Sequence, residues 1–224
     1  MVYKKIFMSG TNTEVGKTYI TENLLSLCVK KQLSVIPFKP IETGCKITKE
    51  GLQPSDAYKY YKILKGKINI DLINPYRFRQ PISPNMAIKI ARKNIKIKNY
   101  IDKLNLLPKK ANLFIEGAGG LCSPISSDGL NIDLIKKIRC PVVLVAKDEI
   151  GVINNVLLSL EMLKKYRIKT SVVVLNRINT KQPKGMDNLN EISSLIRIPI
   201  VQVIKGKNNL SAFNTILKII NFWC

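Results

Sequence analysis

A segment near the start of the chain has the composition of a phosphate-binding loop. Residues 10–18 read Gly-Thr-Asn-Thr-Glu-Val-Gly-Lys-Thr, after a short apolar run and at the start of a helix-like stretch. Backbone N–H groups of such a loop bind phosphate, Lys17 reaches the β- and γ-phosphates, and the Thr18 hydroxyl binds Mg²⁺. Five residues rather than four separate Gly10 from Gly16, so a purely structural glycine turn is the alternative.

A lysine stands at the end of the next apolar run. Residues 38–44 read Phe-Lys-Pro-Ile-Glu-Thr-Gly, and Pro40 favours an extended backbone at Lys39 and ends a strand there. Ligands of open α/β sheets bind at the carboxyl ends of the strands, so Lys39 can face the same crevice as Lys17. Two lysines there suit a negatively charged reaction centre. The alternative is a lysine that is simply solvated.

Two carboxylates are candidates for holding Mg²⁺. Residues 115–120 read Ile-Glu-Gly-Ala-Gly-Gly, so Glu116 ends a third apolar run and small residues after it let the backbone approach a ligand. Asp56 lies in a Pro-Ser-Asp-Ala stretch. The alternatives are an exposed Glu116 beside a glycine turn, and an Asp56 that stabilises the first turn of a helix capped by Ser55.

These side chains need strands that end together and helices that begin beside them. Short β-rich runs alternate with stretches of helical period, which predicts a parallel sheet flanked by helices. We expect strands at residues 5–9, 34–39, 111–116, 141–146, 171–176 and 200–204. We expect helices to begin near Gly16, Ser55, Gly151, Asp187 and Asn209. The fold class is therefore α/β, a single-domain P-loop fold over residues 1–224, with a mostly parallel sheet and helices on both faces.

Composition limits the chemistry. The 224 residues, 46% of them hydrophobic, suit one sizeable domain, and no apolar run approaches the roughly 18 to 20 residues of a membrane span. Residues 1–6 lead straight into a strand-like run, so we expect no signal peptide, no membrane partner and a cytoplasmic protein. The absence of histidine excludes Ser-His-Asp and Cys-His catalysis and histidine zinc sites.

Cysteine spacing and charge exclude two further classes. The cysteines are odd in number and never spaced as Cys-x-x-Cys, which argues against a disulfide framework and a zinc ribbon; they are Cys28, Cys45, Cys122, Cys140 and Cys224. The formal net charge is +22, but the basic residues are 30 Lys and only 7 Arg, spread without interleaved aromatic residues. Arginine is the preferred reader of bases and phosphates, so we expect no nucleic-acid partner.

The motifs in this order resemble the signature of the dethiobiotin synthetase family. That signature is Gly-Thr-x-Thr-Glu-Val-Gly-Lys-Thr, Lys-Pro-x-x-[Ser/Thr]-Gly, Ser-Asp-Ala and Glu-Gly-Ala-Gly-Gly, and it includes the five-residue spacing of the loop. The resemblance extends through residues 74–76, 81–84 and 150–155 to about Asn176, and covers roughly four fifths of the chain.

The resemblance implies roles for single residues. Lys39 and Lys17 would be catalytic, and Mg²⁺ would be held by Thr18, Asp56 and Glu116. Nucleotide-binding residues would be Glu14, Val15, Gly16, Lys17, Thr18, Tyr19, Asp56, Glu116, Gly117, Ala118, Gly119 and Asn176. Substrate-binding residues would be Thr13, Thr43, Gly151, Val152, Ile153 and Asn154, the last four from the other subunit of a homodimer. A helix N-terminus suits the substrate carboxylate.

The reaction that the resemblance implies uses ATP, CO₂ or bicarbonate, and 7,8-diaminopelargonate. A carbamate of the substrate attacks the γ-phosphate to form a carbamic-phosphoric anhydride, and the second amine then closes the ureido ring of dethiobiotin. The alternatives are a P-loop small-molecule kinase and a partitioning-type ATPase switch. Such switches carry an extra lysine where this chain has Asn12, which argues against that class.

The resemblance is weakest where the base of the nucleotide is read. The family has an Asn-Asp pair and a later Pro-Trp-Leu type segment, whereas this chain has Asn176-Arg177 and no such segment. We therefore expect weaker discrimination of adenine, because selectivity comes from buried groups that the wrong base leaves unpaired. The alternative is that backbone atoms near Lys205 read adenine equally well.

Overall fold

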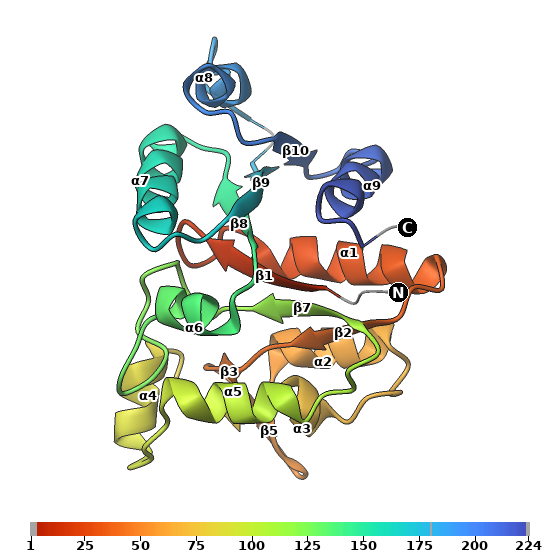
Figure 1. Cartoon of the computed structure of the whole chain (residues 1–224), viewed down its shortest axis with the longest axis vertical. Coiled ribbons are helices and arrows are strands. Elements are labelled where there is room, and N and C mark those ends of the chain that lie inside the picture. Colours follow the sequence, from red (N-terminus) through yellow and green to blue (C-terminus); the bar gives the residue numbers. More distant parts are fainter. Residues whose placement is uncertain (1–3, 180, 223–224) are drawn as a thin grey trace.

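A six-stranded parallel sheet forms the centre of the molecule (Figure 1). The computed structural model describes residues 4–179 and 181–222, so Met1, Val2, Tyr3 and Cys224 lie outside the described residues. The strands stand in the order β10-β9-β8-β1-β7-β2, and every neighbouring pair is parallel. They are β1 Lys5–Gly10, β2 Val35–Phe38, β7 Asn112–Glu116, β8 Val142–Lys147, β9 Thr170–Arg177 and β10 Ile200–Ile204. Each overlaps an expected strand, and the predicted fold class is confirmed.

Helices cover both faces of this sheet. One face is packed by α1 Lys17–Lys30, α2 Ser55–Ile63, α3 Ile70–Ile73 and α9 Leu210–Ile219. The other is packed by α4 Pro84–Ile90, α5 Ile97–Asn105, α6 Asn131–Ile138, α7 Val152–Lys165 and α8 Asn188–Leu195. The helices expected near Gly16, Ser55, Gly151, Asp187 and Asn209 all begin within one residue of those positions.

The strands form where they do because they are apolar on both faces. In β1, Ile6 and Met8 pack into the hydrophobic cluster under α1, while Phe7 between them packs into the opposite cluster. Alternate side chains of a strand point to opposite faces, so a strand covered twice needs an unbroken apolar run. This requirement explains why the strands could be predicted from short apolar runs in the sequence.

Several short elements were not predicted from the sequence. Helices α3 to α6 have between 4 and 9 residues. The shortest, α3, is too brief to show helical periodicity, whereas α5 has an apolar stripe at Ile97, Tyr100 and Leu104 that the sequence prediction overlooked. Two small sheets also lie outside the main one: parallel β3 Ile41–Glu42 with β6 Tyr76–Arg77, and antiparallel β4 Lys46–Thr48 with β5 Gly51–Gln53. The first of these matters for function, since β3 places Glu42 and precedes Thr43.

The carboxyl edge of the sheet brings the candidate residues together. Phe38 of β2 is in register with Ile115 of β7, so the residues that follow, Lys39 and Glu116, come side by side. Glu116 is also in register with Met8 of β1, whose strand leads into the phosphate loop. Three motifs that are far apart in sequence therefore meet at one edge, as the sequence analysis expected.

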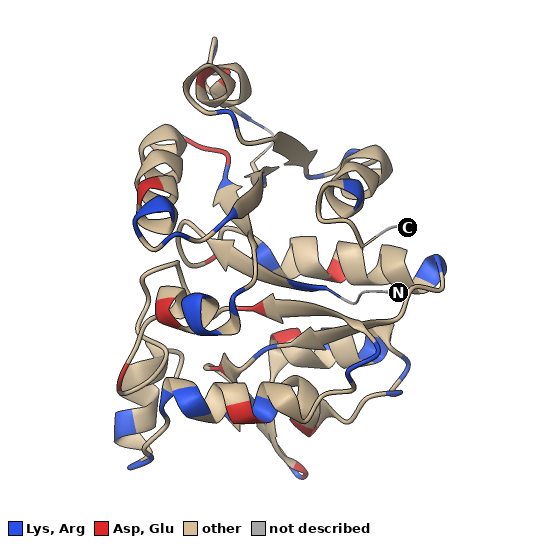
Figure 2. Ribbon diagram, in the orientation of Figure 1, with Lys and Arg blue, Asp and Glu red and all other residues tan. Residues whose placement is uncertain are grey.

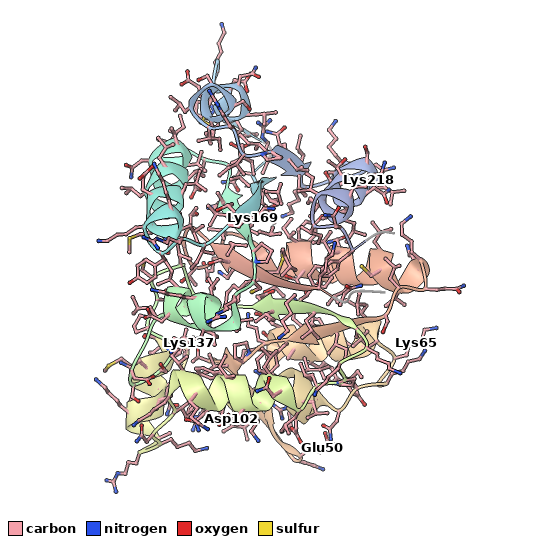
Figure 3. The ribbon with its side chains drawn as sticks, in the orientation of Figure 1. Glu50, Lys65, Asp102, Lys137, Lys169 and Lys218 are labelled. Atoms are coloured by element: carbon pink, nitrogen blue, oxygen red, sulfur yellow. The ribbon has the colours of Figure 1, made fainter. Side chains whose placement is uncertain are left out.

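Charged side chains are spread over the whole molecule. Lysines and arginines occur on most elements and are interleaved with acidic residues (Figure 2). Four labelled lysines, Lys65, Lys137, Lys169 and Lys218, lie at separate places around the fold (Figure 3). None of the helices in the described ranges has the length and apolar composition needed to cross a membrane.

Candidate active site

The phosphate loop is closed by a glycine that no other residue can replace without strain. Gly16 caps α1 with a φ of 93°, in the left-handed region. A Cβ at this position would lie 2.0 Å from Nδ2 of Asn176, and that nitrogen donates to the carbonyl of Val15 at 2.9 Å. Asn176 at the end of β9 thus braces the loop from behind, and the first amides of α1 remain available for an anion.

Lys17 is buried at the base of the loop. Its Nζ donates to the carbonyl of Asn12 at 3.1 Å. Burial, and secondarily the charge of Lys39, lower the pKa of Lys17 to about 8. A phosphate group beside this amine would restore its preference for the charged form, because an opposite charge raises the pKa of a lysine.

Glu116 is a fully buried carboxylate with donors on every side. Its Oε1 accepts from the Thr18 hydroxyl at 2.9 Å and from Nζ of Lys39 at 2.5 Å. Its Oε2 accepts from Thr21 at 2.7 Å and from the Tyr60 hydroxyl. Burial and then the charge of Glu116 hold the pKa of Tyr60 well above its usual value, so this hydroxyl remains a donor.

Lys39 joins this carboxylate to a second one. Its Nζ lies 2.9 Å from Oδ2 of Asp56 and 2.5 Å from Oε1 of Glu116. Burial disfavours the charge of Lys39, but Glu116 and Asp56 outweigh it and raise the pKa of Lys39, which stays protonated. Burial likewise opposes ionisation of Asp56, and Lys39 outweighs it and lowers the pKa of Asp56. The buried Asn74 fixes the backbone here, with Nδ2 donating to the Lys39 carbonyl at 2.6 Å.

The oxygen atoms around Lys39 suit a magnesium ion. Two carboxylates, Asp56 and Glu116, already converge on one cationic group, and the Thr18 hydroxyl bonds to Glu116. Carboxylate and hydroxyl oxygens are the ligands that Mg²⁺ prefers, usually with phosphate oxygens and waters completing the shell. Thr18 and Asp56, which line the pocket, therefore fit the metal that the sequence predicts. Glu116 is engaged by four donors, so it would have to exchange one of them for the ion.

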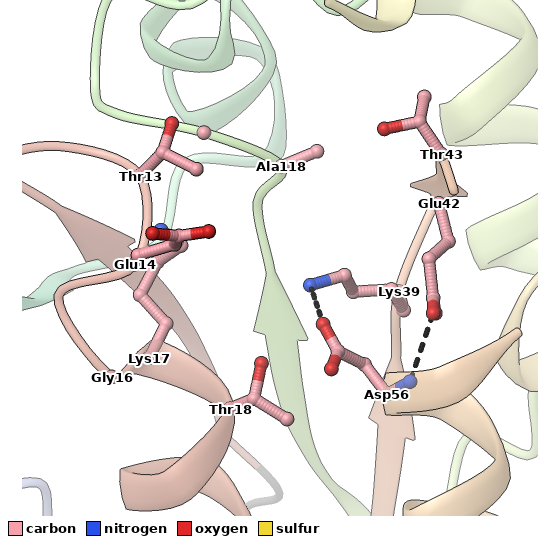
Figure 4. A pocket seen from close by; sticks show the side chains of 11 residues that line it. Thr13, Glu14, Gly16, Lys17, Thr18, Lys39, Glu42, Thr43, Asp56 and Ala118 are labelled. Atoms are coloured by element: carbon pink, nitrogen blue, oxygen red, sulfur yellow. Dashed lines mark hydrogen bonds and ion pairs between the residues drawn. The ribbon is translucent and has the colours of Figure 1, made fainter. Parts of the chain in front are cut away.

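A pocket of about 300 Å³ lies in front of these groups (Figure 4). It is lined by Thr13, Glu14, Gly16, Lys17, Thr18, Lys39, Glu42, Thr43, Asp56, Ala118 and Gly119. Ten of these eleven residues were predicted as site residues, so residues from four sequence motifs share one cavity. The pocket is polar, and its lining includes two lysines and three carboxylates, which suits an anionic ligand bound with a metal.

The remaining predicted residues lie elsewhere. Val15 and Glu116 are buried behind the pocket wall, and Gly117 follows Glu116 at the end of β7. Tyr19 lies on the outer side of α1, with its ring centroid 6.4 Å from that of Phe213. The four residues at the start of α7, which are Gly151, Val152, Ile153 and Asn154, do not line this pocket.

Three functional residues were missed from the sequence. Tyr60 and Thr21 hold Glu116, and Glu42 lines the pocket, where burial in particular raises the pKa of its carboxyl. Helical spacing could have found two of them, since Tyr60 stands four residues after Asp56 and Thr21 three after Thr18. Arg177, which follows Asn176 where the resemblance has an acid, donates from its Nε to the buried Asp148 at 2.9 Å.

Sequence comparison with known proteins identifies the family. Residues 4–213 match a family described as an AAA domain. The chain is 35% identical over 210 residues to the ATP-dependent dethiobiotin synthetase BioD of Vesicomyosocius okutanii, covering 94% of this chain and 93% of that protein. It is 30% identical over 208 residues to the enzyme of the same name from Aeromonas salmonicida, covering 92% of each. It is 32% identical over 201 residues to the enzyme of the same name from Legionella pneumophila (strain Paris), covering 88% of this chain and 92% of that protein.

Solved structures with a similar fold include a plasmid partition protein and a ParA family ATPase. A plasmid partition protein from Borrelia burgdorferi has a TM-score of 0.60 at 15% identity, with 98% of each chain covered. A ParA family ATPase from Chlorobium tepidum has a TM-score of 0.55 at 14% identity, with 99% and 98% covered. At these identities the similarity concerns the fold alone.

The conformation of Gly16 yields a first prediction. Gly16→Ala places a Cβ against Asn176 and forces an L-residue to a φ of 93°, so we expect nucleotide affinity to fall by roughly tenfold or more. The matched control is Gly51→Ala, because Gly51 has a φ of 108° but nothing within 4 Å of the added Cβ. Calorimetric titration with ADP measures both variants. Equal ADP affinity of the two would contradict the role given to the loop.

Proposed function

The chain belongs to the ATP-dependent dethiobiotin synthetase family, and we propose that it closes the ureido ring of dethiobiotin at the pocket lined by Lys17 and Lys39. It is an enzyme, an ATP-dependent ligase of biotin biosynthesis that forms C–N bonds. The observation that carries this conclusion is the meeting of four family motifs at one pocket. Two of them supply the buried lysines Lys17 and Lys39, a third supplies Asp56, and the fourth supplies Ala118 and Gly119, with Glu116 directly behind the wall.

The reaction consumes an amine pair, CO₂ and ATP. One amine of 7,8-diaminopelargonate adds to CO₂ and loses a proton, which gives a carbamate. A carbamate oxygen attacks the γ-phosphorus and expels ADP, which forms the carbamic-phosphoric anhydride. The second amine attacks the carbonyl carbon, loses a proton and expels phosphate, which leaves the cyclic urea. Each intermediate is anionic, so the main task of the protein is to position anions and offset their charge.

The residues of the pocket divide this task. Lys17 binds the β- and γ-phosphates from the floor of the loop, and Lys39 offsets charge that develops on the carbamate and the transferred phosphoryl group. Thr13 and Thr43, which line the same pocket, hold the carbamate and the substrate. Thr18, Asp56 and Glu116 would hold Mg²⁺, which when bound neutralises phosphate charge. No histidine is required for any of these steps.

Nucleotide is bound by the loop and by the chain after Glu116. The loop residues Glu14 to Thr18 surround the phosphates, and the segment 117–119 contributes backbone near them. Tyr19, whose ring lies near Phe213 on the outer side of α1, contributes through its backbone N–H. Asn176 contributes by bracing the carbonyl of Val15. Weak discrimination of adenine remains a prediction. It is supported by Arg177, which stands where the family has an acid and whose side chain is hydrogen-bonded to Asp148.

A kinase or a nucleotide switch is the competing function. Similarity to partition ATPases concerns the fold, and Asn12 stands where those proteins carry their additional lysine. The position of Lys39 also argues against a nucleotide switch. This buried lysine, paired with two carboxylates, lines the pocket and does not lie on a surface where a partner protein could contact it. A kinase would release ADP without needing CO₂.

The active unit that we propose is a two-fold homodimer in the cytoplasm. The start of α7 does not line the pocket of its own chain, although its N-terminus carries no acidic residue in the first turn and suits a carboxylate. A partner's α7 can supply that end to the substrate. Ile150, which is 79% exposed beside it, is consistent with an interface there. The free thiols Cys28, Cys45, Cys122 and Cys140 are consistent with a reducing compartment.

The first test of the function is a turnover assay with single omissions. We expect ADP to form only when diaminopelargonate and bicarbonate are both present, because the phosphoryl acceptor is a carbamate made from both. ADP release is measured with each component omitted in turn, Mg²⁺ included. ADP formation that needs the amine but ignores bicarbonate would favour a kinase, and hydrolysis insensitive to both would favour a switch.

The second test concerns the shared site. Lys39→Ala should reduce turnover by roughly a hundredfold or more, as for other losses of a charge-stabilising group. Asn154→Asp should also be inactive, because it places a negative charge where the substrate carboxylate binds. Random mixing of equal amounts of the two variants makes about half of the dimers hybrids, each with one intact site, so about a quarter of all sites in the mixture are intact.

Recovery of activity on mixing is the expected result. The control is the same mixing protocol applied to Lys39→Ala alone, which should recover nothing. If subunit exchange is verified and the mixture stays inactive, each pocket is complete within one chain and the dimer proposal is wrong.

A further inference from the structure

Helix α2 begins without a cap of its own. The residue at its N-cap is Pro54, in an extended conformation, and it makes no side-chain hydrogen bond to the helix. Proline has no side-chain acceptor, whereas helices usually begin with Ser, Thr, Asp or Asn, whose oxygen accepts from the second or third amide. In α2 those amides belong to Asp56 and Ala57.

Glu42 supplies the missing cap from another element. Its Oε1 accepts from the backbone N–H of Asp56 at 2.8 Å, and its Oε2 accepts from that of Ala57 at 3.1 Å. Glu42 is buried, with 5% of its surface exposed, and it lies on the short strand β3 next to Thr43. A carboxylate at a helix N-terminus is stabilised by the helix dipole as well as by both hydrogen bonds.

The capped residue is itself a functional one. Asp56 points its carboxylate at Lys39 while its own amide is held by Glu42, as Figure 4 shows. Both the position and the rotation of the first turn of α2 therefore depend on Glu42. Residues that orient metal-binding carboxylates through such hydrogen bonds strongly affect metal affinity.

We propose that Glu42 is a positioning residue, which caps α2 from β3 and thereby orients Asp56 for Mg²⁺. Glu42 acts through the backbone of α2 and needs no contact with the reacting atoms. Both of its oxygens are engaged by amides, which distinguishes it from Asp56 and Glu116, whose oxygens face Lys39. The inference rests on the proposed function only in the assignment of Asp56 to the metal.

The test measures how much a divalent ion strengthens ADP binding. Affinity for ADP is determined by calorimetry with and without Mn²⁺, which reports on the metal site without turnover. Glu42→Ala should reduce the Mn²⁺-dependent gain by roughly ten- to a hundredfold. Metal-free ADP binding should not weaken, because the change removes a negative charge from the lining of the pocket. Glu42→Gln keeps one acceptor oxygen and should give a smaller loss. The control is Asp128→Ala, since Asp128 lies outside the pocket and accepts the first amide of α5, from Ile97, at 2.8 Å.

A rescue variant separates positioning from direct contact. Pro54→Asp in the Glu42→Ala background gives α2 a local cap, because an aspartate at the N-cap can accept from the same amides. We expect this double variant to recover most of the Mn²⁺-dependent gain. A residue that touched metal or substrate directly would not be replaced by a change at Pro54.

The outcomes decide the proposal one way or the other. A Glu42→Ala chain that keeps the full Mn²⁺-dependent gain contradicts it, and so does a folded double variant that recovers nothing. If both Glu42 variants fail to show a cooperative thermal transition while Asp128→Ala does, Glu42 is a folding residue and the proposal is wrong. A chain that shows the expected Mn²⁺ effects but makes no dethiobiotin would sustain this inference while overturning the proposed function.

Discussion

The site depends on one buried carboxylate, that of Glu116. A charge withdrawn from water is tolerated only when it is paired and hydrogen-bonded, and leaving such a charge without its partner costs about 3–5 kcal/mol. Lys39, Thr18, Thr21 and Tyr60 meet this requirement, and they come from the end of β2, from α1 and from α2. The need to satisfy Glu116 therefore ties three elements to the carboxyl edge of the sheet.

The burial of charge around Glu116 also distinguishes the two lysines of the pocket from the many lysines on the surface. The chain has 37 basic residues, yet among the described residues only Lys17 and Lys39 are buried, and both line the pocket. Exposed lysines interact weakly with their surroundings because water and salt screen them. Two carboxylates keep the buried Lys39 charged, while burial, together with the charge of Lys39, lowers the pKa of Lys17 to about 8. Lys39 is thus firmly protonated before an anion binds, whereas an anion beside Lys17 strengthens the preference of Lys17 for its charged form.

Much of the fold was predictable because its causes are local in sequence, and most of the pocket residues were predicted from the resemblance of four motifs to one family. A strand covered on both faces must be apolar throughout, which located β1 and β8, and a phosphate loop needs its glycines and lysine at fixed spacing. Glu42 was not predictable, since its role comes from a two-residue strand that meets the start of α2 only in the folded chain. Asn176 was assigned to the nucleotide site, but its contact with Val15 depends on how β9 approaches the loop.

The central claim is that this pocket activates a carbamate by phosphorylating it. Its most direct test is the transfer of oxygen from ¹⁸O-labelled bicarbonate during turnover with diaminopelargonate and ATP, with the released phosphate analysed by mass spectrometry. Because the attacking carbamate oxygen stays on phosphorus when the ring closes, the account predicts phosphate that carries one ¹⁸O atom derived from the bicarbonate. Dethiobiotin formed together with unlabelled phosphate, under conditions where bicarbonate keeps its label, would contradict it.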